Sequence, residues 1–230
     1  MIACHPTSLQ KTHHHYSVFE SWAGFITSYN SSIQVTVNSD ISLTAKFTGV
    51  NNYFTFDGDS NIPEIKNAIL SLLNDCATRY LLDNNLYLHG QIPIEKSSSL
   101  SLFSWGPVSH TIKWNVAGFD NTNLFLIHEL FHAYQHGVDT VNTGRNINNE
   151  IESFMAQYKY CEKYNLLECL PGTVQGWRDS FGAYLISPTS ENYDIMINYV
   201  RNLQQGAYTE SEFPDIATKR NIDNINSIFT

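Results

Sequence analysis

The segment 122–136 carries apolar residues at a spacing that a helix, but not a strand, gathers on one side. On a helical wheel, five of them form one continuous apolar arc: Leu126, Ile127, Leu130, Phe131 and Tyr134. His128, Glu129 and His132 fall together on the opposite arc. The sequence therefore predicts a helix that buries one face and presents two histidines and a glutamate on the other.

The spacing of the two histidines suits a metal ion. Residues at positions i and i+4 of a helix project to the same side, about one turn apart. His128 and His132 can therefore reach one zinc ion at ligand distances of about 2.0–2.1 Å. Glu129 lies on the neighbouring sector, where it can take a proton from a metal-bound water. We expect the two histidines to be metal ligands and Glu129 to be the general base.

A catalytic zinc usually has three protein ligands, so a third is needed. His136 continues the same helix face, but a rise of about 12 Å from His128 is an awkward span for one ion. A supporting or substrate-facing role is expected for it instead. On the next predicted helix, 147–165, Glu150 lies at the border of the apolar face, whereas Glu152 lies on the side expected to be solvated. We therefore predict Glu150 as the third ligand.

The chain resembles the gluzincin metallopeptidases over about residues 110–160. The resemblance rests on two motifs, His128-Glu129-x-x-His132 and Asn149-Glu150-x-x-Ser153. In that clan the third ligand is a glutamate on a following helix, commonly within Asn-Glu-x-x-Ala/Ser. The acidic residue that often comes next in the clan is Phe154 here, so support for a ligand histidine must come from elsewhere.

The resemblance implies an α+β, zincin-like fold. A twisted mixed sheet would pack on the active-site helix, and the following helix would carry the third ligand. The segment 111–116 would be the edge strand that holds an extended peptide by backbone hydrogen bonds. The resemblance to gluzincins further implies one Zn²⁺ per chain and hydrolysis of peptide bonds. It leaves open whether the chain is an endopeptidase or an aminopeptidase.

Stabilisation of the oxyanion needs a further hydrogen-bond donor from beyond the third ligand. Four tyrosines could supply it, and no spacing selects one of them: Tyr184, Tyr193, Tyr199 and Tyr208. Two other functions remain as alternatives. The domain could bind zinc without catalysis and serve as a peptide- or surface-interaction module. It could also lack a metal and act as an interaction domain built on the strands within 33–56.

Composition limits the partners. Thirteen Lys and Arg against 22 Asp and Glu give a formal net charge of -9, and clustered cations for phosphate binding are missing, which disfavours nucleic acid. No apolar run approaches the roughly 18 residues needed to span a bilayer. The expected partner is a peptide or protein substrate. The run His13-His14-His15 is expected to be a solvated surface stretch.

The cysteines do not decide the cellular location of the protein. Cys4, Cys76, Cys161 and Cys169 form no Cys-x-x-Cys pair, so free thiols are expected, with a Cys161–Cys169 disulfide as the alternative for an exported protein. Cys4 follows Met1-Ile2-Ala3, which resembles the end of a bacterial lipoprotein signal if the natural start lies upstream. Otherwise a cytoplasmic location is expected.

The pattern along the chain predicts two portions. Residues 1–60 form a polar N-terminal segment followed by strands, and residues 61–230 form the zincin-like domain, unless the two make one continuous domain. Strands are expected at 33–37, 43–47, 53–56, 86–88 and 111–116. Helices are expected at 63–82, 122–136, 147–165 and 191–205.

Overall fold

The computed structural model describes residues 17–28, 32–36, 40–58, 63–97, 103–115, 122–139, 145–203 and 208–216, together with 225, 228 and 229. Cys4 and its lipoprotein-like context lie outside these residues, as does the run at 13–15. In chain order the strands are β1 (Ser17–Gly24), β2 (Leu43–Gly49), β3 (Phe54–Phe56), β4 (Ile92–Lys96), β5 (Phe103–Gly106) and β6 (Thr111–Trp114). The α-helices are α1 (Pro63–Leu73), α2 (Cys76–His89), α3 (Thr122–Val138), α4 (Ile147–Tyr164), α5 (Val174–Trp177), α6 (Ala183–Ile186) and α7 (Ser190–Leu203).

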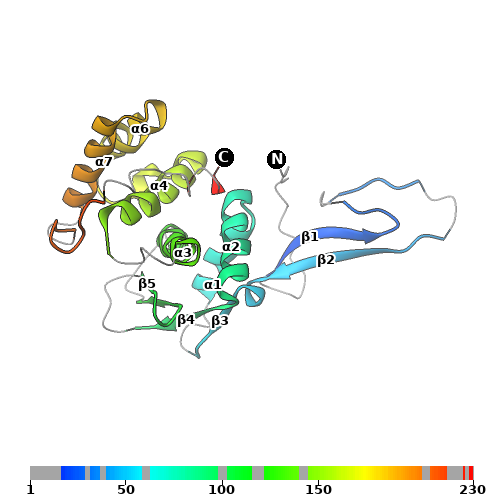
Figure 1. The fold of residues 1–230 in the computed structure, drawn as a ribbon. Helices are drawn as coiled ribbons and strands as arrows, with labels where there is room; N and C mark the ends of the chain where they lie inside the picture. Colours follow the sequence, from blue (N-terminus) through cyan, green and yellow to red (C-terminus); the bar gives the residue numbers. More distant parts are fainter. Residues whose placement is uncertain are drawn as a thin grey trace.

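The fold is α+β with a mixed sheet. Four strands lie in the order β3-β4-β6-β5, with β3, β4 and β6 parallel and β5 antiparallel to β6. In Figure 1, α1, α2 and α3 lie above this sheet, and α4, α6 and α7 lie beyond α3. A separate antiparallel pair, β1 with β2, projects to the side. Among the described residues, no helix has the length and apolar character needed to cross a membrane.

The sheet and the helices share one core. Ile94 and Ile112 on the central strands are fully buried, and so are Leu126 and Leu130 on α3. These side chains belong to one apolar cluster that continues into α1, α4 and α7. The apolar arc predicted for α3 is therefore the face that anchors this helix in the core.

The predicted helix 63–82 is divided into α1 and α2 at Asn74–Asp75. Asp75 caps α2, because its carboxylate accepts a hydrogen bond from the Thr78 N–H at 2.9 Å. The same carboxylate pairs with Lys163 and accepts from the Tyr164 hydroxyl at 2.8 Å, both on α4. Burial alone would raise the pKa of Asp75, but these partners lower it. The break between the helices thus ties α2 to α4.

Several local predictions are wrong. Residues 86–88 belong to α2 rather than to a strand, because Leu86 follows the buried Leu82 at the i, i+4 spacing of a helix and packs against the same core. Residues 33–36 form no strand, and residue 37 lies outside the described part of the chain. The strand β1 was missed inside a stretch that reads as polar. Helices α3, α4 and α7 confirm the predicted helices, and β2, β3 and β6 confirm three predicted strands.

The edge-strand prediction for 111–116 is also wrong. β6 lies between β4 and β5, so the edge strands of this described sheet are β5 and β3. Of these two strands, β5 is the one that packs closely on α3. The sheet includes β3, which precedes the expected boundary at residue 60, and the division into two portions stays a prediction.

The cysteines in the described part of the chain, Cys76, Cys161 and Cys169, are free thiols. Burial, with a smaller effect from Cys169, raises the pKa of Cys161 to about 12. This buried thiol stays protonated at neutral pH and packs as a small apolar group.

Candidate metal centre

Two packed helices, α3 and α4, bring the predicted ligands together. The Nε2 atoms of His128 and His132 lie 3.0 Å apart. One carboxylate oxygen of Glu150 lies 3.2 Å from the His128 Nε2, and the other lies 3.4 Å from the His132 Nε2. Ligand atoms that share one tetrahedral zinc at about 2.0–2.1 Å lie about 3.3–3.4 Å apart. Two imidazole nitrogens and one carboxylate at these distances fit a zinc ion.

Two glutamine side chains contact the histidine rings at their Nδ1 atoms. The His128 Nδ1 lies 3.2 Å from the Gln157 side-chain oxygen, and the His132 Nδ1 lies 3.0 Å from that of Gln135. The amide nitrogen of Gln157 donates to the Leu124 carbonyl, which fixes the direction of its amide group. Because an amide oxygen accepts and does not donate, each Nδ1 carries the proton. Each Nε2 is thereby directed, as a ligand atom, into the group.

Glu152 is buried, contrary to the prediction of a solvated side chain. It is 5% exposed, and its carboxylate accepts a hydrogen bond from the Gln135 amide nitrogen at 2.9 Å. The prediction failed because α3 and α7 both pack on α4, and residues 151–158 of this helix are all buried. Glu152 therefore contacts His132 indirectly, through Gln135, while Glu150 faces both histidines.

The charges of the group depend on one another. Burial opposes a charge on His132, but the Glu150 carboxylate outweighs it and raises the pKa of His132 to about 9. Burial would likewise raise the pKa of Glu150, but His132 and His128 lower it well below its usual range. The metal-free group thus retains a proton beside the carboxylate. A bound dication would replace that proton, as metal binding to histidine generally does.

Glu129 lies beside this group and faces the sheet. Its carboxylate accepts a hydrogen bond of 2.6 Å from the backbone N–H of Trp105 on the edge strand β5. It is close enough to His132 to favour the protonated ring. The predicted general base therefore lies between the ligand group and β5.

Tyr208 is the tyrosine that the structure brings to the centre. Burial raises its pKa, and the nearby Glu150 and Glu129 carboxylates raise it further. Its ring packs against Phe154 and Phe213 at centroid distances of 6.1 and 5.0 Å.

The segment that carries Tyr208 is tied to the start of α4. The Ile147 N–H donates to the Pro214 carbonyl at 3.2 Å, and the Ile216 N–H donates to the Asn148 side-chain oxygen at 2.8 Å. Asn148 also donates to Asp215 at 3.1 Å. These bonds join residues more than sixty positions apart, so no local motif could have selected Tyr208.

The other three tyrosines have different surroundings. The Tyr193 hydroxyl accepts a hydrogen bond from Asn148, and the Tyr184 ring packs against the Tyr193 ring. The Tyr199 hydroxyl donates to the Thr173 carbonyl. His136, for which a supporting or substrate-facing role was expected, groups with His89 and His110.

Comparison of the chain with protein-family models, with curated proteins and with solved structures gives no match.

Proposed function

We propose that this chain is a zinc-dependent peptidase with a zincin-like fold. The observation that carries the proposal is the convergence of His128, His132 and Glu150, with both ligand nitrogens directed inward and the Glu129 carboxylate alongside. The antiparallel edge strand beside the metal-binding helix supports the fold assignment.

Each residue has a distinct part in hydrolysis. When bound, zinc supplies a Lewis acid that polarises a carbonyl group and lowers the pKa of a bound water to about 7. Glu129 accepts the proton of the attacking water and then delivers it to the nitrogen of the leaving amine. Tyr208 donates a hydrogen bond to the carbonyl oxygen as that oxygen gains negative charge. The Trp105 N–H keeps the Glu129 carboxylate oriented throughout.

The edge strand β5 is the proposed substrate-binding strand. Its inner side pairs with β6, and its outer side is next to α3. An extended peptide that adds to such an edge is held through its backbone, and its scissile carbonyl is held in a fixed register. The substrate would then lie between β5 and the ligand group.

The proposed function is tested with purified protein and a mixture of peptides of diverse sequence. We expect cleavage products by mass spectrometry with zinc-loaded protein, none after treatment with a chelator, and recovery when zinc is restored. A chelated sample that cleaves as fast as the loaded one would contradict a zinc peptidase. Bound zinc without any cleavage would favour the non-catalytic interaction module.

Replacing Tyr208 by Phe should lower kcat about 10²–10³-fold, the usual cost of one oxyanion donor. Phe keeps the ring contacts with Phe154 and Phe213 and removes the hydroxyl alone. KM and the bound zinc should change little, which steady-state kinetics and metal analysis would show. Tyr199→Phe is the matched control, because its hydroxyl bonds to Thr173. Equal rates for the two variants would remove Tyr208 from the mechanism.

A further inference from the structure

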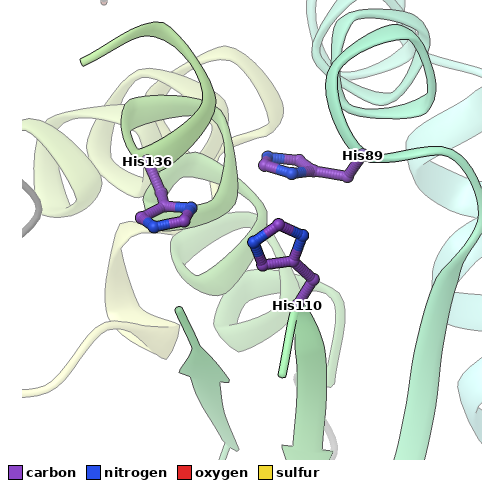
Figure 2. A group of neighbouring side chains, drawn as sticks. All are labelled: His89, His110 and His136. Atoms are coloured by element: carbon purple, nitrogen blue, oxygen red, sulfur yellow. The ribbon is translucent and has the colours of Figure 1, made fainter. Parts of the chain in front are cut away.

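A second group of histidines lies outside the proposed centre. His89 ends α2, His110 is the last residue before β6, and His136 lies in the last turn of α3. Figure 2 shows the three rings facing one another from these three elements. Their ligand nitrogens all lie within 4.8 Å of one another. Ring centroids are 4.9 Å apart for His89 and His110, and 5.2 Å apart for His110 and His136.

Two ring nitrogens of this group, the Nδ1 atoms of His89 and His136, have no hydrogen-bond partner among the described residues. The His89 Nε2 lies 2.8 Å from the Ala133 carbonyl oxygen, which accepts, so Nε2 carries the proton and Nδ1 has a lone pair. The Nδ1 atoms of His89 and His136 are both buried. Buried polar atoms are rarely left unsatisfied. A ring that donates one N–H to a carbonyl and keeps the other nitrogen free is typical of a metal-ligating histidine.

The backbone around the group is arranged to bring the rings close. His110 has φ +50°, a left-handed conformation that few residues other than glycine adopt. Gly137 lets the end of α2 approach α3, because an added Cβ would lie 2.8 Å from the Leu88 Cδ1 and 3.0 Å from the His89 Nε2. A glycine and a strained histidine thus both favour the close approach of these elements.

We propose that His89, His110 and His136 form a second metal site, which binds a divalent first-row transition metal such as zinc. Three imidazoles are the ligand set that zinc, copper and nickel favour, and a harder ion such as magnesium prefers oxygen. Burial lowers the pKa of His89 and of His136, and the neighbouring rings lower both further. Both shifts favour the neutral form of these two rings, which is the form that binds a metal.

The second site would connect the edge strand to the metal-binding helix. The Trp105 ring packs against the His89 ring at 5.4 Å and stacks on the His110 ring at 5.9 Å. The backbone N–H of the same residue holds Glu129. A metal at the three histidines would join α2, the β5–β6 turn and α3, and would thereby fix the strand that orients the general base.

Counting bound zinc tests the second site. The protein is prepared with His13, His14 and His15 replaced by Ser, so that this run binds no metal, then stripped, loaded with zinc and freed of excess. We expect two zinc ions per chain in this background by atomic spectroscopy. His110→Asn should bind one, since Asn tolerates the left-handed backbone and lacks the ring. His132→Ala should also bind one, and the combined variant none.

A second substitution tests whether a loss of zinc in His110→Asn comes from misfolding of that variant. His89→Gln removes the ring while its amide nitrogen can still donate to the Ala133 carbonyl, and it should also bind one zinc. In the His132→Ala background, zinc should raise the midpoint of thermal unfolding, and His110→Asn should abolish that rise. Unchanged zinc content in both His110→Asn and His89→Gln would overturn the second site. Unchanged zinc content in His132→Ala would instead overturn the centre proposed on α3 and α4.

Discussion

Replacing Glu129 by Gln should lower peptide hydrolysis by about 10²–10⁴-fold, the range typical of a general base. Gln has nearly the same shape, and its side-chain oxygen can still accept the hydrogen bond from the Trp105 N–H. Because Glu129 is not one of the three ligands, the bound zinc should remain. The measurements are steady-state cleavage of a peptide substrate and zinc content of the same preparation.

Glu162→Gln is the matched control for this substitution. Glu162 lies on α4 away from the ligand group and accepts a hydrogen bond from the Tyr158 hydroxyl. Its replacement should leave the cleavage rate within about a factor of two, as expected for a surface change. A Glu129→Gln protein that holds zinc and cleaves at the rate of the unchanged chain would exclude Glu129 as the base.

Replacing Glu150 by Ala should weaken zinc binding at the α3–α4 centre by more than the 10- to 100-fold that loss of an outer-shell partner typically costs. The substitution removes the one anionic ligand and leaves two neutral imidazoles facing the ion. Competition with a chelator of known affinity measures the change. The His110→Asn background is used, so that zinc at the second histidine group does not enter the titration.

Glu152→Ala provides the comparison two residues away. Glu152 contacts Gln135, which in turn holds His132, so we expect a smaller loss of about 10–100-fold. Glu150→Gln, which keeps the size of the side chain, separates loss of the ligand from loss of packing. A zinc affinity lowered more by Glu152→Ala than by either Glu150 variant would reverse the assignment of the two glutamates.

The geometry of α3 could be predicted because helical spacing alone decides it. The i and i+4 positions of His128 and His132 and the apolar arc opposite them are properties of one short segment. Choosing Glu150 over Glu152 also followed from the wheel, since Glu150 lies at the border of the apolar face. The assumption that Glu152 is solvated failed because a helical wheel contains no information about how many helices pack on α4.

Features that depend on contacts between distant segments could not be predicted from the sequence. That β5 rather than β6 is the edge strand depends on strand order, which the apolar pattern of a strand does not record. The segment that carries Tyr208 is held near Glu150 by hydrogen bonds from Ile216 to Asn148 and from Ile147 to Pro214, which no local motif marks. The grouping of His136 with His89 and His110 could not be predicted for the same reason, because these two residues approach it from other elements.

Residues 208–216 pack on the start of α4, far along the chain from the proposed ligands. The proposed metal binding and the proposed hydrogen-bond donor therefore come from different parts of the sequence. The proposed ligands and the glutamines that contact them lie between residues 128 and 157, whereas the hydroxyl proposed to take part in the reaction belongs to the later segment. A nascent chain synthesised only as far as α7 would contain the proposed ligands but lack the proposed hydrogen-bond donor, so the proposed hydrolysis would also require the later segment.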